Sequence, residues 1–149
     1  MKMMFDTNIY DKIIDIPGMV DRLNQLTKEG KLIVLCTHIQ EDELARIPDE
    51  KKRHAIAEIS RKMVTTSGAV WGVSKCGKAT WGPGGKGKIN IEAIRQGNAE
   101  DTEDALIGTT AERDADVLVT EDNRFAERMK RLNPSCEIWN FVKLKEYLS

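Results

Sequence analysis

Short apolar runs alternate with longer amphipathic stretches along this chain. Each apolar run is followed by polar residues at which a helix can begin, and several contain the β-branched side chains that favour strands. Four such runs predict strands: Lys2–Phe5, Lys31–Cys36, Val117–Thr120 and Glu137–Trp139. This alternation is typical of a parallel sheet whose strands are joined by crossover helices, so we predict an α/β fold.

The stretches between these runs have helical spacing or begin at helix-capping residues. Helical spacing predicts helices over Met19–Lys28, Asp42–Ile47, Asn123–Leu132 and Phe141–Leu148. Two further helices are predicted from capping residues. Asp49 is expected to cap a helix that runs towards Met63, and Asn98 one that reaches about Arg113.

Residues 65–97 interrupt the alternation of strands and helices. Seven of the chain's eleven glycines lie between residues 68 and 87. Residues 69–81 contain aromatic and β-branched side chains that favour a hairpin, whereas residues 82–87 are too rich in glycine to be rigid. Because 149 residues are about the length of one domain, we predict a single domain, residues 1–149, with residues 65–97 as a glycine-rich insertion or hairpin within it.

Composition narrows the class of protein further. No apolar run approaches the roughly 18 residues that span a bilayer, and the first residues lack the apolar core of a signal peptide, so we expect a cytoplasmic protein with no membrane partner. Cys36, Cys76 and Cys136 are far apart and odd in number, which indicates reduced thiols rather than disulfides or a zinc site. His38 and His54 are isolated and have no nucleophile beside them in the sequence.

The net charge of −1 conceals two oppositely charged segments. Residues 61–96 contain seven basic residues and one acid, whereas residues 98–122 contain nine acids and one arginine. A basic, glycine-rich segment with tryptophans can follow a phosphate backbone and stack on bases. The candidate nucleic-acid-binding residues are Lys75, Lys78, Trp81, Lys86 and Lys88. The alternative is a solvated surface loop whose tryptophans fold back onto the core.

Four carboxylates follow predicted strands or lie near the starts of predicted helices. Asp6 ends the first strand, Asp122 follows the third by two residues, and Glu43 comes soon after the second. Asp104 lies near the start of the helix that leads into the third strand. Ligands of open parallel sheets bind beyond the carboxyl ends of the strands, so these acids are expected to converge. A site made only of oxygen ligands suits Mg²⁺ or Mn²⁺.

Two of these assignments leave alternatives open. Glu41 and Asp42 are adjacent to Glu43 and compete with it for the place of the second acid. Asp101, one helical turn before Asp104, is either an extra ligand or part of the helix cap. The acids as a group are alternatively a solvated helix face and turn formers.

Taken in order, several short segments resemble the PIN domain family. The matching segments are Asp6-Thr7-Asn8, Glu43-Leu44, Asp104-Ala105-Leu106-Ile107-Gly108-Thr109-Thr110-Ala111 and Leu118-Val119-Thr120-Glu121-Asp122-Asn123-Arg124-Phe125. The resemblance covers nearly the whole chain apart from the glycine-rich insertion. It implies three layers, α/β/α, around a small and mainly parallel sheet.

The resemblance also implies a function and roles for individual residues. Asp6, Glu43, Asp104 and Asp122 fall on the family's catalytic, metal-binding acids, and Thr7, Asn8 and Thr120 fall on its polar supporting positions. The implied activity is a Mg²⁺- or Mn²⁺-dependent endoribonuclease that hydrolyses single-stranded RNA and leaves a 5′-phosphate and a 3′-hydroxyl. Alternatives are the toxin of a toxin–antitoxin pair with an inhibitory protein partner, a nuclease for DNA, and a non-catalytic nucleic-acid-binding protein. Many relatives are homodimers, so a homodimer is a further expectation.

Overall fold

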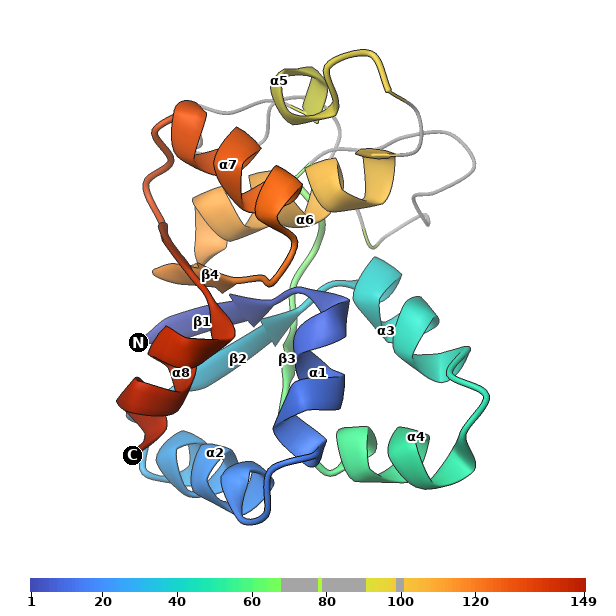
Figure 1. Ribbon diagram of the computed structural model, residues 1–149, viewed down its shortest axis with the longest axis vertical. Helices are drawn as coiled ribbons and strands as arrows, with labels where there is room; N and C mark the ends of the chain where they lie inside the picture. Colours follow the sequence, from blue (N-terminus) through green and yellow to red (C-terminus); the bar gives the residue numbers. More distant parts are fainter. Residues whose placement is uncertain (68–77, 79–90, 99–100) are drawn as a thin grey trace.

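The computed structural model describes residues 1–67, 78, 91–98 and 101–149. In this part of the chain one sheet of five strands runs in the order β3-β2-β1-β4-β5, and every pairing is parallel (Figure 1). The strands are β1 (Lys2–Phe5), β2 (Ile33–Cys36), β3 (Lys62–Met63), β4 (Val117–Val119) and β5 (Glu137–Trp139). The predicted α/β class is confirmed.

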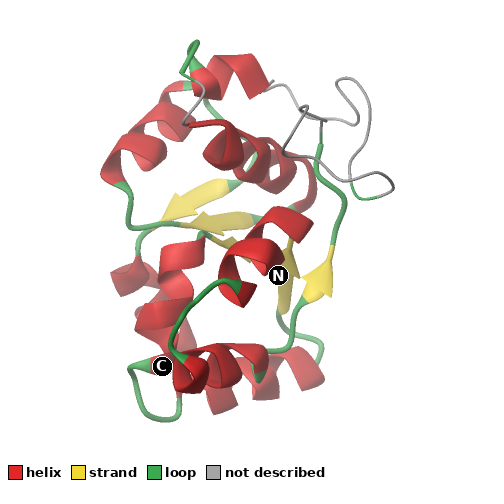
Figure 2. Ribbon diagram, turned by 90° about the vertical axis from the view of Figure 1, so that its right-hand side faces the viewer, coloured by secondary structure: helices red, strands yellow, loops and turns green. Residues whose placement is uncertain are grey.

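Eight helices in the described residues complete the fold. They are α1 (Thr7–Ile14), α2 (Met19–Lys28), α3 (His38–Ala45), α4 (Glu50–Ala57), α5 (Ile91–Arg95), α6 (Thr102–Asp114), α7 (Asn123–Arg131) and α8 (Phe141–Leu148). Helices α5, α6 and α7 cover one face of the sheet, and α1, α2, α4 and α8 lie on the other (Figure 1). Figure 2 shows the strands between these two layers of helices. The fold is therefore a three-layer α/β/α arrangement.

The alternation of side chains along the strands builds two separate cores. Met3 and Phe5 of β1 belong to the core under α1, α2 and α8, whereas Met4 belongs to the core under α5, α6 and α7. All three side chains are fully buried. A strand covered on both faces reads as a continuous apolar run, which explains why β1 is visible in the sequence.

The strand order places a crevice at one position of the sheet. The chain moves from β1 to β2 and β3 on one side, then returns to β4 and β5 on the other, so the order reverses between β1 and β4. Phe5 at the end of β1 is opposite Val119 at the end of β4. The residues that follow these two strands therefore share the edge at which parallel sheets bind ligands.

One predicted helix is too long. The helix capped by Asp49, which accepts a hydrogen bond from the Lys52 amide at 3.2 Å, ends at Ala57 rather than near Met63. Lys62 and Met63 instead form β3 and pair with the end of β2. Both β3 side chains are exposed, so an alternating apolar pattern does not mark this edge strand.

Other boundaries also differ from the prediction. Helices α1 and α5 are absent from the predicted elements, and α3 begins at His38 because Thr37 and Gln40 form a capping box. Helix α6 begins at Thr102, with Asp101 rather than Asn98 at the N-cap position. These differences arise at short elements and helix ends, where local sequence signals are weakest.

Most of the glycine-rich segment lies outside the described residues, including the hairpin predicted over residues 69–81. Lys78 is described: it is exposed, and its carbonyl accepts a hydrogen bond from the Thr66 amide at 3.0 Å. Within the described part of the chain, no helix is long and apolar enough to cross a membrane.

Close packing of α6 against its neighbours depends on Gly108. A Cβ atom there would lie 2.8 Å from Ile94 Cδ1, 2.8 Å from Met129 Sδ and 3.2 Å from Phe125 Cε2. Gly108→Val is therefore expected to lower the free energy of unfolding by about 1–3 kcal/mol, because added carbons overpack the core. Urea unfolding followed by circular dichroism measures the change. Ala57→Val, at an exposed position of α4, is the control, and an equal loss in both variants would contradict the packing argument.

Candidate active site

Two acids meet at the edge shared by β1 and β4, joined by one hydroxyl group. Thr120, the first residue after β4, donates a hydrogen bond from Oγ1 to Asp6 Oδ2 at 2.6 Å. The same Oγ1 accepts a hydrogen bond from the Asp122 amide at 3.0 Å. Thr120 is buried, as is Asp6 with 8% of its surface exposed. The hydroxyl thus fixes the relative positions of Asp6 and the turn that carries Asp122.

Each of these acids also caps a helix. Asp6 accepts a hydrogen bond from the Thr7 amide at 2.7 Å at the start of α1, and Asp122 accepts one from the Phe125 amide at 3.0 Å at the start of α7. The side chain of Asn8 lowers the pKa of Asp6. Two helix N-termini therefore direct their amides towards carboxylates at the same edge of the sheet, an arrangement that favours negative charge.

Glu43 reaches this region from α3. Thr7 donates a hydrogen bond from its hydroxyl to Glu43 Oε2, which connects α3 to the start of α1. The competing acid Glu41 forms an ion pair with Arg61, with 2.8 Å between Oε1 and Nε. Of these two acids, Glu43 is thus the one held beside Asp6.

Asp104 lies in the first turn of α6, and the charges of the other acids affect its pKa. The pKa of Asp104 is raised to about 6, first by burial and then by the negative charges of Asp6 and Asp122, while Arg128 opposes the shift. Burial also raises the pKa of Asp6. Like charges raise carboxylate pKa values in this way when they crowd together at a partly buried site.

Glu103 is a member of this region that the motif analysis does not single out. Burial raises the pKa of Glu43 to about 7, and a hydrogen bond with Glu103 is the next largest cause of the rise. Glu103 precedes Asp104 in the first turn of α6, so α6 presents two neighbouring acids to the site. The dense acidic run around residues 100–104 is the sequence signal that could have indicated it.

Asp101 lies near these acids but is occupied by basic and amide groups. Its carboxylate forms an ion pair with Arg128 and accepts a hydrogen bond from Asn98 Nδ2 at 3.0 Å. The hydrogen bond from Arg128 lowers the pKa of Asp101. Its side chain makes no helix-capping hydrogen bond. Asp101 thus connects α7 to the start of α6.

The structure does not bring all the predicted site residues together. Within the described residues, no three His, Cys, Asp or Glu side chains form a group that could hold a metal ion as they stand. Of the predicted nucleic-acid-binding residues, Lys78 is described and exposed. Lys75, Trp81, Lys86 and Lys88 lie outside the described residues.

Comparison of the chain with models of protein families, with curated proteins and with solved structures gives no match. The case for any function therefore rests on the arrangement of its own side chains.

The bridging hydroxyl of Thr120 should contribute to stability. Thr120→Val keeps the side-chain shape but removes the hydrogen bond to the buried Asp6 carboxylate. A charge-assisted hydrogen bond of this kind contributes about 1.5–3 kcal/mol, so we expect a loss of that size in the free energy of unfolding at pH 7.5. Thr109→Val is the matched control, because the buried Thr109 hydroxyl bonds to carbonyls of its own helix. Equal effects of the two substitutions, measured by urea unfolding, would argue against a special role for Thr120.

Crowding of the acids predicts an unusual dependence of stability on pH. Because the pKa of Asp104 rises from 3.8 to about 6 on folding, the folded protein holds a proton that the unfolded chain loses between about pH 4 and 6. Stability from this group is present below pH 4 and is lost as the pH rises through 6. Asp104→Asn should therefore raise the free energy of unfolding at pH 7.5 by about 1–2 kcal/mol, allowing for partial exposure, and change it little at pH 4.

This pH effect is measured by urea unfolding in EDTA at pH 4, 6 and 7.5. Asp21→Asn, at an exposed position of α2, is the control and should show no comparable pH-dependent gain. A loss of stability in Asp104→Asn at pH 7.5 would show that the carboxylate is stabilising and that the acids are not in conflict.

Proposed function

We propose that this protein is a metal-dependent endoribonuclease that hydrolyses phosphodiester bonds of single-stranded RNA. The observation that carries the proposal is the Thr120 hydroxyl, which bonds to the Asp6 carboxylate and to the Asp122 amide at the point where the strand order reverses. The negative charges of Asp6 and Asp122 both raise the pKa of Asp104. Carboxylates that raise one another's pKa values lower the free energy of unfolding at neutral pH. Groups of this kind cluster at functional sites.

The chemistry of these side chains fits a divalent cation. The acids Asp6, Glu43, Asp104 and Asp122 offer only carboxylate oxygens, the ligands that Mg²⁺ and Mn²⁺ prefer. A cation would relieve the repulsion that raises the pKa values of Asp6, Glu43 and Asp104. When bound, the ion would supply an activated water and offset negative charge on the phosphate. The supporting residues Thr7 and Thr120 would orient the acids through the hydrogen bonds described above, and Asn8 would favour the charged form of Asp6.

Glu43 gives this proposal a pH dependence. With a pKa of about 7, Glu43 holds a proton in about half of the molecules at neutral pH, so a cation that binds there must displace it. Affinity for Mn²⁺ should accordingly be higher at pH 8 than at pH 6.

The substrate class and cellular setting extend the same proposal. RNA is preferred over DNA, and Lys75, Lys78, Trp81, Lys86 and Lys88 would contact the strand outside the acidic site. A cytoplasmic location agrees with the free, buried thiols of Cys36 and Cys136. Control by an inhibitory protein, as in a toxin–antitoxin pair, and assembly as a homodimer are compatible with this activity.

The nuclease proposal is tested by cleavage of end-labelled single-stranded RNA and DNA with Mn²⁺, Mg²⁺ or EDTA. We expect cleavage with a metal ion, none with EDTA, and a loss of more than about 100-fold in Asp104→Asn, because removing a ligand should exceed the 10–100-fold cost of removing a supporting group. Asp21→Asn should cleave like the wild type. Cleavage that survives EDTA, or is unaffected by Asp104→Asn, would overturn the proposal.

A further inference from the structure

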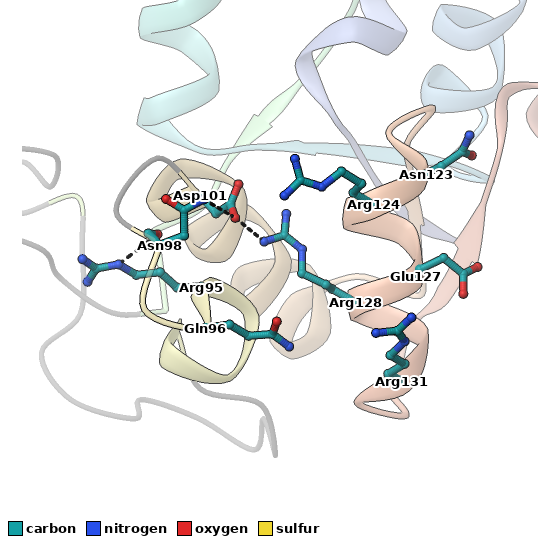
Figure 3. Close-up of a pocket in the computed structure, with 9 residues that line it drawn as sticks. All are labelled: Arg95, Gln96, Asn98, Asp101, Asn123, Arg124, Glu127, Arg128 and Arg131. Carbon is teal, nitrogen blue, oxygen red and sulfur yellow. Dashed lines mark hydrogen bonds and ion pairs between the residues drawn. The ribbon is translucent and has the colours of Figure 1, made fainter.

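A basic pocket lies between α7 and the segment that joins α5 to α6 (Figure 3). Its volume is about 490 Å³. The residues that line it are Arg95, Gln96, Asn98, Asp101, Asn123, Arg124, Glu127, Arg128 and Arg131. Four of these nine residues are arginines and two are acids, so the lining is positively charged overall.

Three of the arginines share one side of a single helix. Arg124, Arg128 and Arg131 are spaced four and three residues apart on α7, the spacing of neighbours on a helix surface. In Figure 3, Arg124 and Arg128 extend from α7 towards the α5–α6 side of the pocket, whereas Glu127 points the other way. The acid in this stretch of α7 therefore does not neutralise these two guanidinium groups.

Arg128 is bound by two acceptors of the chain and has one donor without a partner among the described residues. Its side chain is only 11% exposed, and Nη1 binds both the Asp101 carboxylate and the Ile94 carbonyl, the latter at 3.3 Å. Its Nε is buried and has no hydrogen-bond partner among the described residues. A buried donor without a partner is rare in proteins, and here it belongs to a side chain that lines the pocket.

Several residues that line the pocket are close in sequence to the acids of the candidate site. Asn123 and Arg124 directly follow Asp122, and Asp101 precedes Asp104 by one helical turn. Arg128 is close enough to lower the pKa of Asp104. It lies six residues beyond Asp122, about 9 Å along α7. A strand whose scissile phosphate sits at the acids would bring its neighbouring phosphates to these arginines.

We propose that this pocket binds backbone phosphates of a single-stranded RNA, next to the phosphodiester bond at the acidic site. This inference rests on the proposed nuclease function and assigns its strand-binding surface. Guanidinium groups present paired N–H donors that match phosphate oxygens, which makes arginine well suited to this contact. None of the residues that line the pocket is among the candidate nucleic-acid-binding residues named from the sequence. Asp101 acts as a positioning residue, because it holds Arg128 in place.

The test measures RNA binding without turnover. Fluorescence anisotropy of a labelled 12-nucleotide single-stranded RNA is recorded in EDTA at several salt concentrations. The pocket variant carries Arg124→Gln and Arg131→Gln, two exposed residues whose substitution costs little stability. The control variant carries Lys28→Gln and Lys130→Gln, which removes the same charge from exposed positions outside the pocket and includes a residue of α7 itself.

We expect the pocket variant to bind about tenfold more weakly, with a salt slope reduced by about 1.4, because each lost phosphate contact lowers the slope by about 0.7 on a single strand. The control variant should bind within twofold of the wild type. Equal losses in both variants, no loss in the pocket variant, or no RNA binding by the wild type would each overturn the assignment.

A separate readout distinguishes failure of this inference from failure of the nuclease proposal. If the wild type binds RNA through the pocket but never cleaves it with Mn²⁺ or Mg²⁺, the pocket stands and the nuclease proposal fails. If the wild type cleaves RNA and the pocket variant binds and cleaves as the wild type does, the pocket assignment fails and the nuclease proposal stands.

Discussion

The hydrogen bond from Thr120 to Asp6 connects the adjacent strands β1 and β4 at their carboxyl ends. It satisfies a buried carboxylate, and through the Asp122 amide it also fixes the turn from which α7 begins. The direction of α7 then determines where its arginines lie relative to α5 and α6. The Thr120 hydroxyl therefore helps to position both the acidic site and the basic pocket.

The carboxylates gathered at this edge of the sheet oppose folding when they are charged. Burial and mutual repulsion raise the pKa values of Asp6, Glu43 and Asp104, which means that their charged forms oppose folding at neutral pH. Two apolar cores, one on each face of the sheet, hold the acids in place despite this cost. A cation at the acids would relieve part of this repulsion, so cation binding and stability are linked.

Helix α7 contributes to three features of the structure, one at its N-terminus and two on its faces. Its first turn is capped by Asp122, its buried residues Phe125 and Met129 pack against α6 at Gly108, and its arginines line the pocket. The ion pair between Arg128 and Asp101 joins α7 to the start of α6, the helix that carries Asp104. A shift of α7 would therefore move the acids and the arginines together.

The sequence by itself determined the α/β class, four of the five strands and the cap at Asp49, because strand patterns and capping residues act over a few neighbouring positions. It also indicated that Asp6 and Asp122 follow strands that could share an edge. Tertiary structure decided the rest. The exposed strand β3 exists only by pairing with β2, Glu43 is distinguished from Glu41 by Thr7 and Arg61, and Glu103 and Arg128 gain their roles from side chains far away in sequence. Contacts across such separations depend on how helices pack against the sheet, which local patterns do not encode.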